Sequence, residues 1–416
     1  MNIFEEVESE VRSYCRSFPA VFTRSKNELI FDSENNSYID FFAGAGALNY
    51  GHNNDKIKRR LLDYLEGDGI IHSLDMYTDS KESFLHHFND IILKPKNLPY
   101  KVQFCGPTGT NANEAALKLC RKLTGRTNIF AFTGSFHGMT TGSLSITSGL
   151  DMRKGAGVPL QNVTFVPYPE SPFNSNIDTI DYMESLILDD HSGVEKPAAI
   201  FLETIQAEGG IYICSDGFLK RIREFCDKYD ILLVVDDVQV GCGRAGTFFS
   251  FESSGIVPDM VSLSKSISGF GLPMALLLIK KELDIWKPGE HNGTFRGHQL
   301  SIIGADAALD YWKTDDFKNG VAVKSGMIKS YIEKNILSLS DKLTYRGKGF
   351  VFGIDFSAVN DDISGAVAKE CFKNRLIIER AGRKDSVLKL LPPLTSTEEN
   401  LTAGLEIIKN AIVKNL

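Results

Sequence analysis

The sequence predicts an α/β protein in which helices cover both faces of a mainly parallel sheet. Two observations support this fold class. Short apolar runs, typical of buried strands, alternate along the chain with segments whose apolar residues recur every three or four positions, as in amphipathic helices. The strand-like runs are apolar almost throughout, which is typical of a sheet that is buried on both faces.

The first clear strand–helix unit begins at residue 101. Residues 101–104 predict a strand, residues 105–111 form a loop rich in Gly, Pro and Thr, and apolar residues then recur at helical spacing until Gly125. The backbone N–H groups of such a loop can bind a phosphate at the positive end of the helix. A plain turn is the alternative for this loop when it is taken alone.

The alternation of strands and helices continues to residue 312. Residues 198–203 and 231–236 predict strands on either side of an amphipathic helix. Two further apolar runs, residues 260–263 and 273–279, flank a short polar segment, and a long helical pattern spans residues 300–312. These elements extend the expected sheet and lead towards a second domain.

The C-terminal part predicts a smaller α+β domain. Its expected strands and helices are residues 350–356, 366–372, 376–379 and 398–413. We place this small domain at residues 310–416, the N-terminal segment that joins it at residues 1–44, and the large domain at residues 45–309.

Composition and charge exclude several classes of protein. Of the 416 residues, 43% are hydrophobic and 24% are charged, as in ordinary globular domains and unlike disordered or fibrous chains. The longest apolar runs, such as residues 231–235, are far shorter than the roughly 18 residues of a membrane-spanning helix. A net charge of -7 disfavours a nucleic-acid partner, because binding a phosphate backbone needs a concentrated positive surface.

The N-terminus and the cysteines predict a cytoplasmic protein. The first residues are acidic and lack the basic and apolar regions of an export signal. Seven cysteines are scattered along the chain without a C-x-x-C pair, which favours reduced thiols over disulfides or a zinc site. No metal site is expected, since the eight histidines also lack the H-E-x-x-H spacing.

A glycine-rich segment at residues 241–246 matches G-x-G-x-x-G but does not predict a dinucleotide site. An aromatic, extended pattern follows it at residues 247–251, where a Rossmann site needs a helix. The sequence also has no G-x-x-x-x-G-K-[ST] phosphate loop.

Charged residues follow two of the buried strands. Asp236 and Asp237 close the strand at 231–236, and Lys265 follows the strand at 260–263 among small residues. A carboxylate at the carboxyl end of a strand lies in the usual ligand crevice. A lysine amine that can be approached closely can form a Schiff base. A helix cap and a solvated charge are the simpler alternatives for these residues taken singly.

An aromatic motif follows another predicted strand. Phe136-His137-Gly138 comes shortly after residues 128–132, and its aromatic ring could lie over a flat cofactor. Packing of the ring into the core is the alternative.

The ordered set of these residues resembles the class III, or ω-amino acid, aminotransferases, which are fold-type I enzymes that use pyridoxal 5'-phosphate. The motifs that carry the resemblance are Gly109-Thr110, Phe136-His137-Gly138, Asp236-Asp237-Val238-Gln239, Lys265 and Thr294-Phe295-Arg296-Gly297. The resemblance extends from about Phe18 to the C-terminus, and the set is specific although each motif alone is not.

The resemblance implies a role for each motif. Lys265 is expected to bind the cofactor covalently and to move the proton during catalysis, and Asp236 to pair with the pyridine nitrogen and keep it protonated. Gln239 is expected near the phenolic oxygen of the ring. Phe136 is expected to stack on the ring, with His137 beside it in the cofactor site.

The resemblance also implies how the phosphate is bound and how the protein assembles. Gly109 and Thr110 are expected to bind the cofactor phosphate. Thr294 resembles a residue that reaches the phosphate of a neighbouring subunit. A homodimer, or a dimer of dimers, is therefore implied.

Two residues that differ from those of relatives narrow the range of possible substrates. Relatives that act on ornithine or acetylornithine carry Arg where this chain has Met139, and Arg again where it has Lys389. Lysine lacks the bidentate fork of arginine, so carboxylate recognition must differ. By analogy with a gating pair in relatives, Lys389 is expected to pair with Glu208. Two unrelated surface charges are the alternative.

Both substitutions are familiar in one subgroup, the diaminobutyrate:2-oxoglutarate aminotransferases, including the ectoine-pathway type. The segments that resemble this subgroup are residues 41–46, 49–53, 72–76 and 293–297. These enzymes move an amino group from glutamate to L-aspartate 4-semialdehyde in a reversible ping-pong reaction, giving L-2,4-diaminobutyrate and 2-oxoglutarate. The implied partners are therefore a small-molecule amino donor and acceptor, with no nucleic acid and no membrane.

Three residues depart from the subgroup, and three alternative functions stay open. Ala207 stands where Gly is usual, and His298-Gln299 replaces an expected Asn-Asn. The alternatives are another ω-amino acid aminotransferase of specialised metabolism, an aminomutase that needs no added 2-oxoglutarate, and a cofactor-binding protein without turnover. The intact Lys265 and Asp236 count against the last of these.

Overall fold

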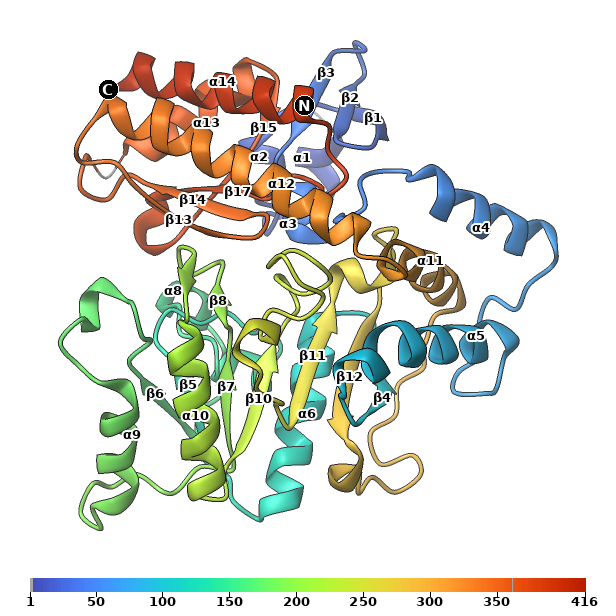
Figure 1. The fold of residues 1–416 in the computed structure, drawn as a ribbon, viewed down its shortest axis with the longest axis vertical. Coiled ribbons are helices and arrows are strands. Elements are labelled where there is room, and N and C mark those ends of the chain that lie inside the picture. The colour runs from blue at the N-terminus through green and yellow to red at the C-terminus, as the bar shows by residue number, and fades with distance from the viewer. Residues whose placement is uncertain (1–2, 361) are drawn as a thin grey trace.

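The computed structural model describes residues 3–360 and 362–416 and has an α/β architecture, as predicted. A seven-stranded sheet lies at the centre of the larger part of the molecule (Figure 1). Its strands are β4 (Tyr100–Phe104), β5 (Ile129–Phe132), β6 (Val163–Val166), β7 (Ala199–Leu202), β10 (Leu232–Asp236), β11 (Met260–Ser264) and β12 (Ala275–Lys280). Their order is β4-β12-β11-β10-β7-β5-β6, and of these seven only β12 runs against its neighbours.

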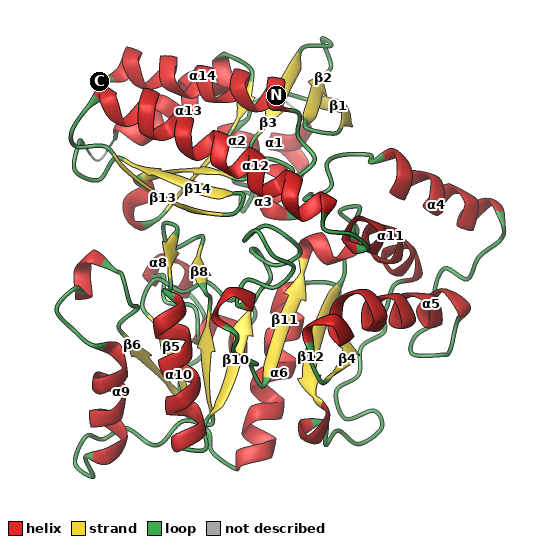
Figure 2. Cartoon of the chain, in the orientation of Figure 1, coloured by secondary structure: helices red, strands yellow, loops and turns green. Residues whose placement is uncertain are grey.

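Helices cover both faces of this sheet, as Figure 2 shows. Helices α9 (Thr179–Leu188) and α10 (Asp216–Lys228) pack with Leu233 and Val235 of β10 on one face. Helix α6 (Gly109–Thr124) packs with Val234 on the other. Successive side chains of a strand point to opposite faces, so burial of both faces explains why the strands are apolar at every position.

The smaller part of the molecule combines two four-stranded sheets with three long helices (Figure 1). The antiparallel sheet has the order β13 (Thr344–Lys348), β14 (Val351–Asp355), β17 (Val387–Leu390), β16 (Glu379–Ala381). The other sheet has the order β1 (Phe22–Lys26), β2 (Leu29–Asp32), β3 (Ser37–Asp40), β15 (Leu376–Ile377). The helices are α12 (Asp316–Tyr331), α13 (Ile363–Lys373) and α14 (Glu398–Asn415).

The N-terminal segment is tied to the C-terminal part. Strand β15 pairs in parallel with β3, and Phe41 is buried in the same apolar cluster as residues of α12 and α14. Both contacts are consistent with the expected joining of residues 1–44 to residues 310–416. The domain borders at 44/45 and 309/310 stay a prediction.

The chain has further α-helices and two short strands. They are α1 (Ile3–Val7), α2 (Tyr14–Ser17), α3 (Ala43–Gly46), α4 (Asp55–Glu66), α5 (Asp79–His87), α7 (Thr141–Ser145), α8 (Leu150–Arg153), α11 (Gln299–Leu309), β8 (Ile205–Gln206) and β9 (Tyr212–Ile213). Within the described residues no helix is long and apolar enough to cross a membrane. All seven cysteines are free thiols.

Two sequence expectations need correction. The strand expected at 376–379 is divided between sheets, since β15 ends at Ile377 and β16 begins at Glu379. The extended conformation expected for 247–251 is wrong. This segment forms turns and bends that bury its three phenylalanines. Only a three-residue 3-10 helix, Glu252–Ser254, follows it directly, so the rejection of a dinucleotide site at 241–246 stands.

Candidate active site

A cavity of about 320 Å³ lies at the carboxyl ends of the parallel strands. Its wall is formed by the start of α6, the loop after β5, and the residues that follow β7, β10 and β11. The predicted site residues that line it are Gly109, Thr110, Phe136, His137, Glu208, Asp236, Gln239 and Lys265. The fold thus brings together residues that lie far apart in the sequence, at the edge of the sheet where α/β proteins bind their ligands.

Lys265 directly follows β11 and reaches the cavity from a strained backbone. Its φ of 54° is in the left-handed region, which costs a residue with a side chain on the order of 1 kcal/mol. Burial, together with the positive charge of Lys389, lowers the pKa of the Lys265 amine below its usual range. No hydrogen bond or ion pair within the described residues holds this amine. A buried amine with a lowered pKa and no partner is suited to act as a nucleophile.

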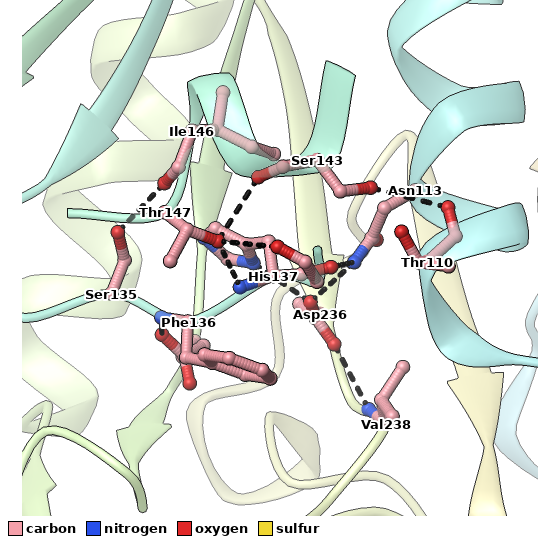
Figure 3. A network of polar contacts seen from close by, with 12 residues as sticks. Thr110, Asn113, Ser135, Phe136, His137, Ser143, Ile146, Thr147, Asp236 and Val238 are labelled. Atoms are coloured by element: carbon pink, nitrogen blue, oxygen red, sulfur yellow. Dashed lines mark hydrogen bonds and ion pairs between the residues drawn. The ribbon is translucent and has the colours of Figure 1, made fainter. Parts of the chain in front are cut away.

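Two side chains hold Asp236, the last residue of β10 (Figure 3). Asn113 Nδ2 and His137 Nδ1 each lie 2.7 Å from Asp236 Oδ2, and the backbone N–H of Val238 donates to Oδ1 at 3.1 Å. Asn113 Nδ2 also donates to the carbonyl of His137 at 2.8 Å. Both carboxylate oxygens therefore have hydrogen-bond partners in the protein, and these neighbours set the orientation of Asp236.

His137 lies against Asp236 with a fully buried side chain. Burial alone would lower the pKa of its imidazole, but the hydrogen bond to Asp236 and the negative charge of Asp236 outweigh burial and raise that pKa. Nε2 of His137 has no hydrogen-bond partner within the described residues. The imidazole thus orients the carboxylate of Asp236, and His137 and its neighbour Phe136 both line the cavity.

Phe136 is anchored through its backbone. Its N–H donates to Glu203 Oε2 at 3.1 Å, and Glu203 follows the last residue of β7. Burial, aided by the charge of Asp236, raises the pKa of Glu203 to about 8. Glu203 lines the cavity and was not selected from the sequence, although its place at the end of an apolar strand is the signal that also marks Asp236.

The start of α6 leaves room for an anion. Thr108 caps this helix in a capping box with Asn111. Gly109 follows, and a Cβ atom there would lie only 2.8 Å from Val238 Cγ1, so no larger residue fits. The Thr110 hydroxyl lies 2.5 Å from that of Thr140, which donates to Glu114. Free N–H groups at the start of a 16-residue helix bind phosphate well.

A cluster of charges lies behind the cavity and reaches its wall through Glu208. Lys389 Nζ lies 2.6 Å from Glu208 Oε1, so the expected pair is present, and 3.2 Å from Glu379 Oε1. Gln239 Nε2 donates to the same oxygen of Glu208 at 2.9 Å and to the carbonyl of Ala45 at 2.9 Å. We call Glu208, Lys389 and Glu379 the charge cluster. The side chain of Lys389 is completely buried, which excludes the alternative of two unrelated surface charges.

Burial and charge shift the pKa values of the two carboxyl groups of the charge cluster in opposite directions. Burial raises the pKa of Glu208, but the positive charges of Lys389 and Lys265 outweigh burial and lower it overall. Burial and the charge of Glu208 raise the pKa of Glu379 despite the opposing charge of Lys389. Glu379 was missed from the sequence, because only its cross-strand pairing with Lys389 reveals it.

The remaining residues of interest lie at or beyond the rim. Met139 lines the cavity and is 56% exposed. Thr294 is exposed and does not line the cavity of its own chain. Ala207 is buried next to Glu208. Gln299 is buried and accepts hydrogen bonds from Thr78 at 2.9 Å and Ser80 at 2.6 Å, so this departure from the subgroup joins α11 to the start of α5.

The fold and this site define the class of the protein. The chain belongs to the class III aminotransferases: its residues 12–412 match the family described as Aminotransferase class-III. Members of this class use pyridoxal 5'-phosphate. The unpartnered buried amine of Lys265, the oriented carboxylate of Asp236 and the glycine at the start of α6 fit the aldehyde, ring nitrogen and phosphate of that group.

Curated relatives narrow the likeness further. The chain is 53% identical to the diaminobutyrate--2-oxoglutarate transaminase of Halalkalibacterium halodurans over 99% of this chain and 96% of the relative. It is 52% identical to the protein of that name from Sporosarcina pasteurii, over the same shares of both chains. The corresponding protein of Bordetella parapertussis is 48% identical over 100% of this chain and 96% of the relative.

Solved structures support the fold. The ornithine aminotransferase of Toxoplasma gondii matches with a TM-score of 0.85 and 21% identity, over 99% of this chain and 93% of that one. An amine transaminase from an uncultivated Pseudomonas species, solved in its PLP-bound form, matches with the same TM-score and identity, over 99% of this chain and 98% of that one. The fold-type I architecture expected from the sequence is thereby confirmed.

Proposed function

We propose that the protein is a diaminobutyrate–2-oxoglutarate transaminase. It transfers an amino group between L-glutamate and L-aspartate 4-semialdehyde, giving 2-oxoglutarate and L-2,4-diaminobutyrate. The observation that carries this proposal is the likeness of 48–53% identity over the full chain to relatives of that name, which come from several organisms. The reaction has two half-reactions, because donor and acceptor use the same cavity in turn.

The cavity residues supply binding and proton transfer. When bound, pyridoxal 5'-phosphate supplies a conjugated ring that withdraws electrons from the carbon whose amino group is transferred. We assign covalent attachment and proton movement at that carbon to Lys265 Nζ. Asp236 would hold a proton at the ring nitrogen, and Phe136 and Gln239, which line the same cavity, would bind the ring.

The start of α6 is the proposed phosphate site. Gly109 and Thr110 supply backbone N–H groups and a hydroxyl there. Thr294 would complete the phosphate site of a second subunit, so we propose a homodimer. Support comes from the exposed apolar residue that follows Thr294: Phe295 is 62% exposed, as is usual for a surface that a partner covers.

Glu208 and Lys389 are the proposed substrate contacts. With the pair closed, the carboxylate of Glu208 neutralises Lys389 and leaves a cavity suited to an amine. When the pair opens, Lys389 becomes available to a carboxylate of glutamate or 2-oxoglutarate. A cytoplasmic location and a role in ectoine synthesis stay predictions.

An assay of purified, cofactor-loaded protein tests the proposed function. We expect L-2,4-diaminobutyrate and 2-oxoglutarate to give glutamate faster than ornithine, 4-aminobutyrate or taurine does under equal conditions. Turnover without 2-oxoglutarate would instead indicate an aminomutase. Preference for another ω-amine would change the assigned substrate and leave the assigned family unchanged.

Light scattering tests the proposed dimer. We expect the measured mass to be that of two chains or four. Mixing Thr294→Ala subunits with Lys265→Ala subunits shows whether Thr294 acts across the interface. A monomer with full activity would refute the role given to Thr294.

A further inference from the structure

Glu203 is a second carboxyl group in the wall of the cavity, and the proposed mechanism does not use it. It directly follows β7, whose last residue Leu202 lies beside Val235 of β10 in a parallel register. The residues that follow this pair, Glu203 and Asp236, are therefore neighbours at the carboxyl edge of the sheet. Residues that lie side by side in a sheet point to the same face, and both of these side chains line the cavity.

The surroundings of the two carboxyl groups differ. Asp236 has three hydrogen-bond partners, at 2.7, 2.7 and 3.1 Å. The carboxyl group of Glu203 has one among the described residues, the N–H of Phe136, which donates to Oε2 at 3.1 Å. No lysine or arginine of the described residues forms an ion pair with Glu203, and only 9% of the residue is exposed. Such surroundings favour the neutral acid over the carboxylate.

Burial has the largest influence on the protonation of Glu203. It raises the pKa to about 8, helped by the charges of Asp236 and Glu208 and opposed by the charge of His137 and the N–H of Phe136. At neutral pH Glu203 therefore keeps its proton, and it ionises above about pH 8. The titratable groups around it come from five elements: His137 after β5, Tyr168 after β6, Glu208 after β8, Cys214 after β9 and Asp236 at the end of β10.

The backbone holds Glu203 at the wall of the cavity. The hydroxyl of Tyr168 donates to the carbonyl of Glu203 at 2.9 Å. The side chain of the next residue, Thr204, donates to Ser250 Oγ at 2.5 Å. Together with the pairing of β7, these contacts fix the chain on both sides of the carboxyl group, so the group stays where a ligand in the cavity meets it.

The charge of this wall affects the two proposed substrates differently. The wall already contains the acidic groups of Asp236 and Glu208. 2-Oxoglutarate carries two negative charges, so a further carboxylate in the wall would repel it, and such repulsion is strong where water is excluded. Diaminobutyrate carries a net positive charge and would not be repelled. The protonation of Glu203 therefore matters for the dicarboxylate half of the reaction.

We propose that Glu203 works as a neutral carboxyl group in the cavity wall, which lets the cavity accept the dicarboxylate substrate, and that loss of its proton weakens the binding of that substrate. This inference rests on the proposed function and adds a specificity residue to it. The hydrogen bond from the N–H of Phe136 does not require ionisation, because the carbonyl oxygen of a neutral carboxyl group also accepts.

Glu203→Gln tests the proposal, because glutamine has the shape of neutral glutamic acid and cannot ionise. The probe is glutarate, a dianion that has the carbon chain of 2-oxoglutarate and cannot react. Its dissociation constant is measured from the absorbance of cofactor-loaded protein at about pH 6 and about pH 9, on either side of the pKa. Over this range we expect the wild-type constant to rise about 10-fold more than that of the variant, because binding and protonation are coupled. At the lower pH the two constants should agree within about threefold.

Further measurements complete the experiment. Glu370→Gln, on α13 and paired with Lys414, is the matched control and should keep the wild-type pH dependence. The KM for diaminobutyrate should not rise more with pH in wild type than in Glu203→Gln. If Glu203→Gln does not bind the cofactor, calorimetry of wild type decides. At about pH 8 glutarate should then bind with uptake of about half a proton, because half of the free carboxyl groups are ionised there.

Several results would overturn the inference. One is the same pH dependence of glutarate binding in wild type and Glu203→Gln, and another is binding to wild type without proton uptake. A large loss of affinity in the variant at the lower pH would also overturn it, since Glu203 would then only hold the loop of Phe136. A wild-type enzyme with the expected glutarate profile that does not react with diaminobutyrate would instead refute the proposed function and leave Glu203 in a site for dicarboxylates.

Discussion

The two sides of the cavity are built differently. On the Asp236 side, Asn113, His137 and the N–H of Val238 occupy the carboxylate and hold it in one orientation. On the Lys389 side, two carboxylates share one cation and Glu379 Oε2 has no partner among the described residues. A carboxylate held by three donors suits a group that stays in place, and carboxylates that share one lysine suit a site in which charge pairs rearrange.

This difference teaches how one cavity can serve two substrates. Diaminobutyrate carries a net positive charge and 2-oxoglutarate a double negative charge. Both must nevertheless place their reacting carbon at the same point in the cavity. Rigid support on one side keeps the reacting groups aligned. Adjustable charge pairs on the other side allow the cavity to accept either ligand in turn.

Lys265→Ala should have the largest effect, because this residue serves both sides. We expect transamination to fall about 10⁴-fold or more and the visible absorbance of the lysine-bound cofactor to disappear. Lys329→Ala, on the exposed surface of α12, is the control and should keep both. An unchanged spectrum would exclude Lys265 as the attachment site.

Asp236→Asn breaks the rigid side. The substitution keeps the size of the side chain and removes the charge, so the proton at the ring nitrogen is no longer stabilised. We expect cofactor to remain bound and turnover to fall about 100-fold or more, for all amines alike. Near-normal turnover, measured by glutamate formation, would refute the role of Asp236.

Lys389→Met perturbs the adjustable side. It leaves the carboxylates of Glu208 and Glu379 without their shared cation, so we expect the KM for 2-oxoglutarate to rise about 10- to 100-fold. The absorbance of the bound cofactor should stay unchanged. Lys389→Arg keeps the charge and should restore most of the lost affinity. If Lys389→Met weakened cofactor binding as much as it weakened 2-oxoglutarate binding, the distinction between the two sides of the cavity would not hold.

Asp237→Asn should have the smallest effect, on stability alone. Burial, with smaller contributions from Asp236 and Glu252, raises the pKa of Asp237 to about 7. The folded protein therefore binds more protons than the unfolded chain, so this group's contribution to stability is full below about pH 4 and is lost as the pH rises through 7. The melting temperature of wild type should therefore fall between pH 5 and pH 8. The melting temperature of the variant should fall by on the order of 2 °C less over the same range. Parallel melting curves would show that Asp237 does not titrate in this range.

Much of the fold and part of the site could be predicted from the sequence. Apolar runs indicated the strands of the central sheet, and strand ends indicated Asp236 and Lys265. The division of residues 376–379 between two sheets could not be predicted, because sheet membership depends on which distant strand supplies the hydrogen bonds. Asn113 was missed for the same reason: its partner Asp236 lies on another element, far along the chain.

The sequence by itself therefore determined the elements, the family and the reactive residues, since these depend on local periodicity and on motifs in a fixed order. Tertiary structure alone decided what surrounds each reactive group. Glu379 becomes a partner of Lys389 only through the pairing of β16 with β17, and its Oε2 is buried there without a partner among the described residues. Hydrogen bonding and desolvation act through space, so they depend on distances that the order of residues does not contain.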